Sequence, residues 1–237
     1  MAARLYLVPN LLGVIEPADV LPAKTIAIAR ELRHFVVENA KPARQFLKTL
    51  GHPLPLREIA IEEIGERPSP ERVAQLLAPL RDGHDIGVLS DAGCPAVADP
   101  GTLLVAAAHR RGLTVVPLVG PSAILLALMA SGLNGQGFAF HGYLPVRPEA
   151  RDERIRHLEA ASRRDGAAQM FIETPYRNPA LVEALTAVCA AHTRLCIAAD
   201  LTTPGESIEM RTIAEWRGRD ASRYARRPAM FILEAAR

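Results

Sequence analysis

The segment of the chain richest in groups for ligand chemistry is the loop from Ser90 to Gly101, which holds two aspartates, two glycines and two prolines. Asp91 and Asp99 can accept hydrogen bonds from ribose hydroxyls or an ammonium group. Gly93 and Gly101 let the backbone approach a ligand closely. The simpler interpretation is a connecting loop in which Asp99 caps the next helix, and the spacing alone favours neither. The loop has no Walker or GxGxxG pattern, so a phosphate cradle is not expected.

Two further segments combine a strand or helix end with polar side chains. In Val119–Ala123, Ser122 can cap the following helix, whose first amides suit a carboxylate. In Phe171–Arg177, an apolar strand ends at Glu173 and is followed by a turn and Arg177. A plain helix cap and a surface ion pair are the simpler interpretations, and the residue types favour them slightly.

Arginines gather in two places, although the net charge is only +2. Such a charge does not by itself indicate nucleic-acid binding. Solvated helix faces are the simpler interpretation of both sets. The second set has fewer acidic neighbours and is the better candidate for contacts to an RNA backbone. The first set is Arg147, Arg151, Arg154 and Arg156, and the second is Arg217, Arg219, Arg223, Arg226 and Arg227.

The elements that must position these residues alternate between short apolar strands and amphipathic helices. This alternation predicts an α/β fold whose mainly parallel sheet is covered on both faces, with the same style in the second half. Ligands of such sheets lie outside the carboxyl ends of the strands, where the polar loops occur. Strands are expected at 5–8, 35–37, 86–89, 113–116, 169–172, 195–199 and 229–233. Helices are expected at 25–35, 43–50, 69–80, 102–109, 122–129, 150–163 and 179–190.

Length and composition allow two domains. The chain has 237 residues, of which 49% are apolar, enough for two sizeable cores. Pro117, Gly120 and Pro121 lie between the last expected strand of one half and the first helix of the next. We therefore expect an N-terminal α/β domain over 1–118 and a C-terminal α/β domain over 119–237.

Cysteine usage and hydropathy favour a cytoplasmic protein. The three cysteines, Cys94, Cys189 and Cys196, are too few for a disulfide framework and lack zinc-ligand spacing. The N-terminus lacks the apolar core of a signal peptide. The apolar stretch 113–133 is interrupted by prolines and a glycine, so it is not expected to span a membrane. We expect no metal and no membrane association.

Taken together, several segments resemble the tetrapyrrole-methylase superfamily of S-adenosylmethionine-dependent methyltransferases. Within it, the chain is most similar to the branch that methylates a ribose 2′-hydroxyl of small-subunit rRNA. The resemblance runs in order over nearly the whole chain, and the ordered set is more specific than any one segment. The matching segments are 90–101, 116–133, 142–145 and 171–177, with weaker matches at 38–47 and 198–202.

The resemblance implies two α/β domains, a homodimer, and S-adenosylmethionine bound in a cleft between the domains, largely through backbone groups. The residues that the resemblance assigns to the cofactor are Pro9, Ser90, Asp91, Ala92, Gly93, Cys94, Pro95, Ser122, Ala123, Glu173, Leu201 and Ala229. Separately from the resemblance, Arg177 is the candidate substrate-binding residue, because a guanidinium can hold a phosphate.

The chain departs from the rRNA branch in two places. The branch's first loop contains a TPIGN-like string, whereas this chain has Val8–Gly13. The branch's acidic EDTR-like string is replaced by Glu38–Lys41, which keeps only the glutamate. Both departures lie in the first domain and indicate a divergent member of the branch.

Methyl transfer from a sulfonium is an in-line displacement that depends mostly on positioning, and a ribose hydroxyl also needs a proton acceptor. Glu38, Asp99 and Glu173 are the candidate acceptors, and the sequence does not choose among them. The leading hypothesis is methylation of a small-subunit rRNA ribose. Two alternatives are methylation of a small molecule such as a tetrapyrrole-like acceptor, and a cofactor-binding regulator without an acceptor site.

Overall fold

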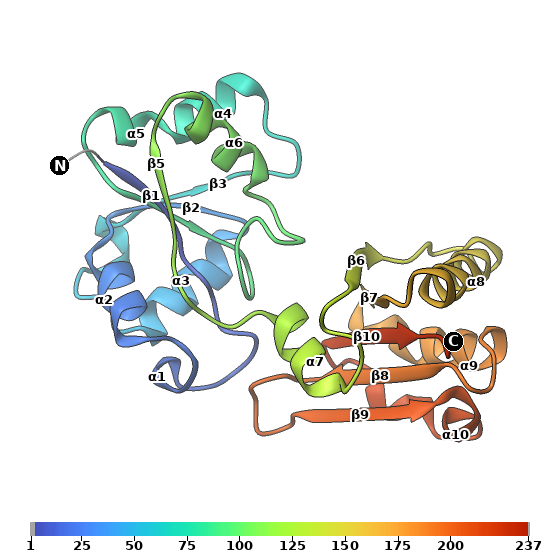
Figure 1. The fold of residues 1–237 in the computed structure, drawn as a ribbon. Coiled ribbons are helices and arrows are strands. Elements are labelled where there is room, and N and C mark those ends of the chain that lie inside the picture. The colour runs from blue at the N-terminus through green and yellow to red at the C-terminus, as the bar shows by residue number, and fades with distance from the viewer. Residues whose placement is uncertain (1–2, 237) are drawn as a thin grey trace. The chain divides into compact units, whose positions relative to one another are not determined.

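The computed structural model describes residues 3–236 and divides into two compact units, Met1–Ser122 and Ala123–Arg237 (Figure 1). Each unit contains one five-stranded sheet with its own hydrophobic core. No helix within residues 3–236 combines the length and the apolar composition needed to cross a bilayer.

The sheet of the first unit is entirely parallel, with strand order β3-β2-β4-β1-β5. Because all five strands run the same way, their carboxyl ends meet at one edge of the sheet. The central strand β4 is buried along its whole length, as expected for a sheet covered on both faces. The strands are β1 (Arg4–Leu7), β2 (His34–Val37), β3 (Ala60–Glu63), β4 (Ile86–Leu89) and β5 (Thr114–Pro117).

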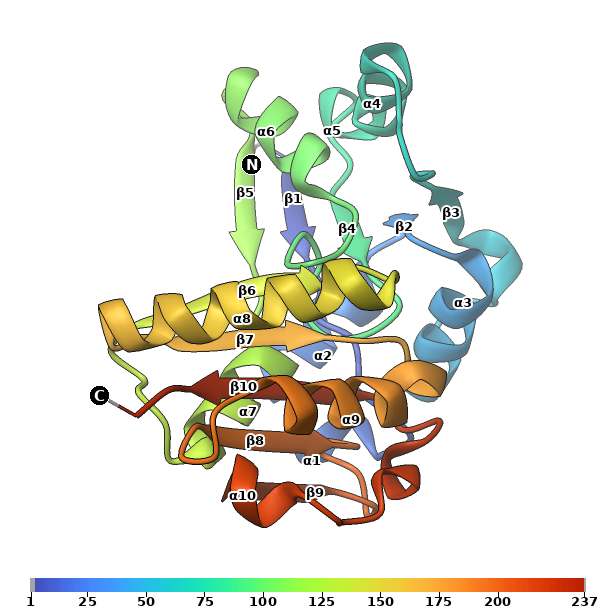
Figure 2. The same cartoon turned by 90° about the vertical axis from the view of Figure 1, so that its right-hand side faces the viewer.

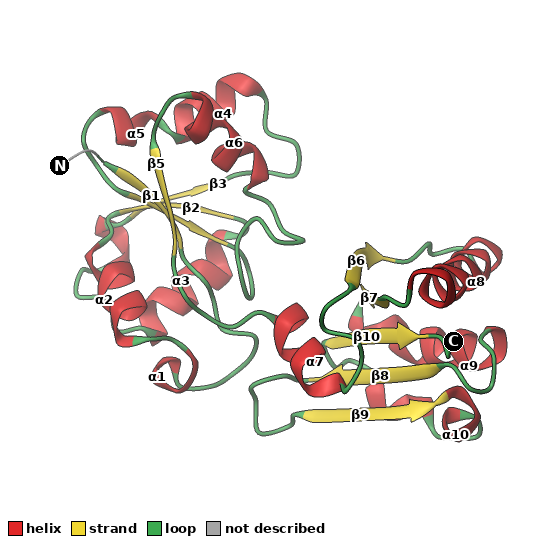
Figure 3. Ribbon diagram, viewed as in Figure 1, coloured by secondary structure: helices red, strands yellow, loops and turns green. Residues whose placement is uncertain are grey.

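Helices cover both faces of this sheet (Figure 3). Successive strand residues point to opposite faces, so Leu5 and Val36 join one core while Tyr6 and Phe35 join the other. One face carries α1 (Pro17–Val20), α2 (Ala23–Glu31) and α3 (Ala40–Thr49), followed in the chain by the 3₁₀ turn η1 (Leu56–Glu58). The opposite face carries α4 (Pro70–Leu76), α5 (Ala78–Arg81) and α6 (Thr102–Arg110).

The sheet of the second unit has the order β6-β7-β10-β8-β9, and only β6 and β7 are parallel. The expectation of a mainly parallel sheet is therefore correct for the first unit and wrong for the second. The reason is local: no helix separates β8 from β9, so they pair as an antiparallel hairpin, and β10 runs back between β7 and β8. The strands are β6 (Phe138–Tyr143), β7 (Ala168–Ile172), β8 (Arg194–Ala199), β9 (Ser207–Thr212) and β10 (Ala229–Glu234).

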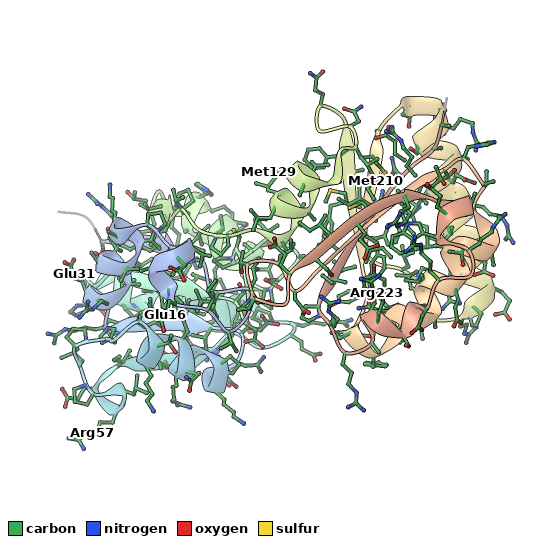
Figure 4. All side chains as sticks on the ribbon, turned by 90° about the horizontal axis from the view of Figure 1, so that it is seen from below. Glu16, Glu31, Arg57, Met129, Met210 and Arg223 are labelled. Carbon is green, nitrogen blue, oxygen red and sulfur yellow. The ribbon has the colours of Figure 1, made fainter. Side chains whose placement is uncertain are left out.

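The helices of the second unit are distributed unequally over its sheet (Figure 2). Phe171 and Phe231 stack at 6.0 Å within the core of the more heavily covered face. Among the described helices, α7 (Ala123–Ser131) alone covers the other face, and Met129 of α7 and Met210 of β9 lie exposed at the surface (Figure 4). The first face carries α8 (Pro148–Asp165), α9 (Asn178–Val188) and α10 (Ile213–Trp216), and the second carries α7 (Ala123–Ser131). Two 3₁₀ turns, η2 (Pro175–Arg177) and η3 (Ala221–Tyr224), complete the unit.

Candidate functional site

The carboxyl edge of the parallel sheet gathers the loops that follow β1, β2, β4 and β5. These loops contain Pro9, Glu38, Ser90–Pro95 and Ser122, so the structure brings the site residues expected in the first unit to one edge. This is where ligands bind in open α/β sheets.

Asn10 holds two of these loops together. Its side-chain Nδ2 donates to the carbonyl oxygens of Ser90 and Asp91, at 3.0 Å each, and its backbone amide donates to the Gly93 carbonyl at 2.8 Å. The residue is only 5% exposed. Sequence reasoning did not single out Asn10, although a polar residue placed directly after an apolar strand was the available signal.

Three carboxyl groups gather on this edge. Glu38 Oε2 accepts a hydrogen bond from the Asp91 amide at 3.1 Å, and Asp91 Oδ2 accepts one from Asn39 Nδ2 at 2.7 Å. Burial, with the charges of Glu38 and Asp91 adding to it, raises the pKa of Asp99 to about 6, against a smaller lowering by Ser90. Asp99 is therefore a carboxyl group with a pKa near neutral pH, and it lies at the polar edge of the sheet that the loops form.

Asp99 is not a helix cap, which corrects the simpler interpretation of its position. The N-cap of α6 is Gly101, at a φ of 131°, and no side chain bonds to the first amides of that helix. Ala96 and Ala98 adopt φ values of 66° and 63°, a conformation that residues other than glycine rarely hold. Backbone strain of this kind concentrates at functional sites.

The loop after β4 presents backbone groups rather than side chains. Within residues 3–236, the backbone amides of Ala92 and Cys94 donate no hydrogen bond to another protein group. Gly93 has a φ of 66°, and a Cβ there would lie 3.2 Å from Leu12 Cδ2. Backbone amides without an intramolecular acceptor can donate to a polar ligand such as a cofactor with an amino-acid or ribose portion.

Gly120 extends this close packing to the loop after β5. A Cβ on Gly120 would lie 2.3 Å from Pro9 Cγ, so the loops after β1 and β5 touch through backbone and ring atoms. Thr25 Oγ1 donates to the Val119 carbonyl at 2.8 Å and fixes the same segment from α2. The edge that holds Pro9 and Ser122 is therefore tightly constrained.

Cys94 serves this site as a neutral thiol. Burial, followed by the charge of Asp99, raises the pKa of Cys94 above its ordinary value. Its Sγ donates to the Pro121 carbonyl at 3.5 Å. A thiol held in its protonated form is a weak nucleophile, so Cys94 contributes packing and a hydrogen bond.

In the second unit, the expected site residues converge at one end of the sheet. Ala229 pairs with Ala199, and Met230 pairs with Ile172, so Ala229 lies beside the carboxyl ends of β7 and β8. Glu173 and Leu201 follow those two strand ends. Ala123 is the first residue of α7.

Glu173 is the buried partner of Arg177. Arg177 Nη2 and Nε donate to Glu173 Oε1 at 2.6 and 2.9 Å, and the Thr174 amide donates to the same oxygen at 2.7 Å. Glu173 is 5% exposed, and the hydrogen bond to it raises the pKa of Arg177. The geometry thus places the guanidinium in a structural ion pair, beside the exposed ring of Tyr176.

Replacing Arg177 by alanine is expected to destabilise the second unit. The change leaves the buried Glu173 carboxylate without its counter-ion, which lowers the free energy of unfolding by about 1–3 kcal/mol. Urea unfolding followed by circular dichroism measures this loss, and Arg177→Lys should retain part of the stability. Unchanged stability together with weakened RNA binding would show instead that Arg177 faces the substrate.

Most arginines of the C-terminal set bond to the protein itself. Arg223 pairs with Glu209 at 2.6 Å, and Arg227 pairs with Asp200 at 2.5 Å. Arg217 donates to the Thr186 carbonyl at 3.1 Å. Because these guanidinium groups already bond to the protein, a structural role for this set is favoured over binding of an RNA backbone.

Comparisons with known proteins agree with this fold. The family model for tetrapyrrole (corrin/porphyrin) methylases matches residues 10–216. Ribosomal RNA small subunit methyltransferase I of Xylella fastidiosa is 32% identical over 206 residues, which make up 87% of this chain and 72% of that protein. The protein of the same name from Escherichia coli O157:H7 is 30% identical over 212 residues, or 90% of this chain and 70% of its own.

Solved structures share the fold at lower identity. Diphthine synthase aligns with a TM-score of 0.69 and 16% identity, covering 98% of this chain and 90% of its own. The methyltransferase CobJ aligns with a TM-score of 0.63 and 19% identity, covering 99% and 94%. The expected two-domain α/β fold and the resemblance stated from the sequence are confirmed. The chain belongs to the tetrapyrrole methylase family, and it is a methyltransferase.

Proposed function

We propose that the chain transfers the methyl group of S-adenosylmethionine to a ribose 2′-hydroxyl of small-subunit rRNA. The observation that carries this proposal is the identity of 32% over 87% of the chain to a protein named for small-subunit rRNA methylation. The carboxyl cluster at the edge of the first sheet agrees with it, because a hydroxyl acceptor needs a proton acceptor.

The cofactor contacts are proposed for the residues that lie at the ends of the two sheets. In the first unit these are Pro9, Ser90–Pro95 and Ser122, with the amides of Ala92 and Cys94 as donors. In the second unit they are Ala123, Glu173, Leu201 and Ala229. When bound, S-adenosylmethionine supplies an electrophilic methyl group on a sulfonium.

Among the three candidate proton acceptors, Asp99 fits the task best. Glu38 Oε2 accepts a hydrogen bond from the Asp91 amide, and Glu173 accepts one from Arg177, so both carboxylates already hold protein donors. Asp99 has its pKa raised to about 6 by burial and neighbouring charges. A base with a pKa close to the working pH accepts a proton most effectively. Glu38 then acts on Asp99 through its charge.

The proposal is tested by transfer of tritiated methyl to small ribosomal subunits from a strain that lacks ribose methylation. Label is expected in the rRNA and should be lost in Gly93→Trp, because residue 93 has a φ of 66° and a Cβ there would already press on Leu12. Gly112→Trp is the matched control, since Gly112 has a φ of 65° and no atom within 4 Å of an added Cβ.

Absence of label, with binding of S-adenosylhomocysteine confirmed by calorimetry in the same preparation, would refute the rRNA assignment. The chain would then be a methyltransferase for another acceptor.

We further propose that the protein is a cytoplasmic homodimer. Leu125, Met129 and Met210 are large apolar side chains left exposed on the second unit, which supports a contact between copies. The three free cysteines agree with a reducing compartment. Light scattering should give a mass of twice the 25.7 kDa of one chain, and a mass of one chain would contradict the dimer.

A further inference from the structure

One flank of helix α8, in the second unit, carries three of the four arginines in the first arginine set of the sequence. Arg147, Arg151 and Arg154 are spaced four and three positions apart, so they lie on the same side of α8 and form its basic flank. Arg156 is two positions from Arg154 and lies on another side. The basic flank faces the edge strand β6, because Arg154 Nη2 donates to Nδ1 of His141 in β6 at 3.1 Å (Figure 2).

Strand β6 is irregular at the position of His141. Its register with β7 shifts between Phe140 and Tyr143, and Gly142 adopts a φ of 65°. An irregularity of this kind bends the strand and redirects the side chains beside it, and such features occur often next to functional sites.

Arg154 is held by a chain of hydrogen bonds that contains no charged acceptor. A guanidinium only donates, so His141 Nδ1 is the acceptor and the neutral ring carries its proton on Nε2. Nε2 then donates to Gln169 Oε1 at 2.7 Å, and Gln169 Nε2 donates to the Ala167 carbonyl at 3.0 Å. Gln169 is 4% exposed, so the chain is anchored inside the protein. These bonds fix the direction of the guanidinium without neutralising its charge.

Carboxylates do not neutralise the basic flank. Within residues 3–236, neither Arg147 nor Arg154 forms a salt bridge. Arg151 Nε lies 3.8 Å from Asp152 Oδ1, and in the described part of the chain neither atom has a hydrogen-bond partner. In the C-terminal arginine set, by contrast, guanidinium groups bond to carboxylates at 2.5 and 2.6 Å. The sequence favours the C-terminal set for RNA contacts, whereas the structure favours the basic flank of α8.

The surroundings of the basic flank favour a nucleic-acid phosphate as its ligand. Guanidinium groups hold phosphate oxygens in pairs, and α8 begins directly after Arg147, so the positive end of its dipole lies there. Glu149 and Glu153 are each two positions from an arginine of the flank and lie on another side of the helix. Tyr143, four residues before Arg147, is 60% exposed and offers a ring on which a base can stack. An acidic peptide would leave that ring unused.

We propose that the basic flank of α8 binds the phosphate backbone of RNA and that Tyr143 stacks on a neighbouring base. Arg147 and Arg154 donate to the phosphate oxygens, and Arg151, whose side chain is 15% exposed, adds its charge from below. His141 is a positioning residue, because it acts through Arg154. The inference rests on the proposed function, since it concerns how the RNA is held, and it gives these residues no part in the transfer of the methyl group.

Fluorescence anisotropy of the full chain with a single-stranded RNA of about twelve nucleotides tests the basic flank. Replacing Arg147 and Arg154 by alanine should raise the Kd about tenfold and reduce the slope of log K against log salt by about 0.7–1.4, the value for one or two phosphates. The control replaces Arg156 and Arg163, which are exposed on another side of the same helix, and should change neither quantity. An equal loss in both double variants would overturn the proposal, because binding would then follow net charge.

His141 provides a test in which every arginine is kept. His141→Leu removes the acceptor that orients Arg154, so the Kd for the RNA should rise about threefold with the salt slope unchanged. His141→Asn places an acceptor oxygen within reach of Arg154 and should recover most of the affinity. Wild-type affinity in His141→Leu would exclude the positioning role.

Two further ligands identify the source of the anion. A peptide of about twelve glutamates has a charge similar to that of the RNA but no bases, so it should bind more weakly, and Tyr143→Ala should weaken RNA binding alone, by about fivefold or more. Equal affinity for the peptide would assign the flank to an acidic protein and overturn the proposal. So would binding of inorganic phosphate with a Kd below about 1 mM that the Arg147 and Arg154 replacements abolish while RNA binding persists.

Steady-state methyl transfer separates this inference from the proposed function. The Arg147 and Arg154 double variant should raise the KM for small ribosomal subunits and leave kcat unchanged, because the phosphate contacts are the same before and during transfer. Methylation of rRNA with an unchanged KM overturns the inference and leaves the function standing. RNA binding that depends on the basic flank, without any methylation of rRNA, supports the inference and refutes the rRNA assignment.

Discussion

Asp99→Asn is expected to lower kcat for methyl transfer by about 10²–10⁴-fold while the affinity for S-adenosylhomocysteine stays within a small factor of the wild type. The substitution keeps the size of the side chain and removes the group that accepts the hydroxyl proton. Single-turnover transfer of labelled methyl measures the first quantity, and calorimetry measures the second. A variant with unchanged kcat would exclude Asp99 as the proton acceptor.

The pH dependence gives an independent readout of the same group. Asp99 must be ionised to accept a proton, so activity of the wild type should rise through a pKa of about 6 and then level off. Because Glu38 and Asp91 interact with Asp99, the observed midpoint belongs to the coupled cluster. Glu38→Gln removes a like charge and should move the midpoint to lower pH. An acid limb that does not move would show that Glu38 has no electrostatic effect on the base.

Asp99→Asn should also be more stable than the wild type at neutral and alkaline pH. The pKa of Asp99 is about 6 when folded and 3.8 without the protein environment, so the folded state binds more protons than the unfolded state between these values. Stability therefore falls as pH rises through this window, and the loss is complete above the folded pKa. Asparagine does not ionise, and solvent screens the partly exposed Asp99, so Asp99→Asn should be more stable by about 1–2 kcal/mol near pH 8 and show no such gain near pH 4. Thermal unfolding at both pH values measures the difference.

The strands that the sequence predicted and those it missed differ in how apolar their residues are. The runs that became β1, β2, β4, β5, β7, β8 and β10 were expected because they are mostly apolar, and this includes β5, although it lies at an edge of its sheet. The three strands not expected, β3, β6 and β9, are all edge strands of their sheets. An edge strand needs less apolar surface, and β3 is mostly exposed, with two glutamates in four residues. Its strand conformation comes from pairing with β2, which no local pattern reveals.

The site residues could be predicted where polar, ligand-binding residue types directly follow an apolar strand in the same segment. The loop after β4 combines aspartates, glycines and prolines directly after an apolar strand, so sequence reasoning reached it. Asn10 and Gly120 were not assigned roles, because their partners are distant in sequence: Asn10 bonds across to Ser90, and Gly120 meets Pro9.

Gly120→Ala is expected to impair cofactor binding more than any other single methyl addition at this edge. The new Cβ would lie 2.3 Å from Pro9 Cγ and 2.5 Å from Pro9 Cβ, distances that side chains do not tolerate. The proline ring has no rotamer that relieves the clash, and Thr25 holds the Val119 carbonyl in place, so the loops after β1 and β5 must separate. Overpacking of this kind lowers the free energy of unfolding by about 1–3 kcal/mol.

The separation displaces Pro9 and Ser122, both proposed cofactor contacts, so the Kd for S-adenosylhomocysteine should rise by about tenfold or more, which corresponds to the loss of about 1.4 kcal/mol of binding free energy. Calorimetry on the variant measures this rise. Gly135→Ala is the control, because an added Cβ at Gly135 meets no atom within 4 Å. Combining Gly120→Ala with Pro9→Gly removes the ring that causes the clash and should restore part of the stability. Wild-type affinity and stability in Gly120→Ala alone would contradict the argument, because the two loops would then be free to separate without affecting the site.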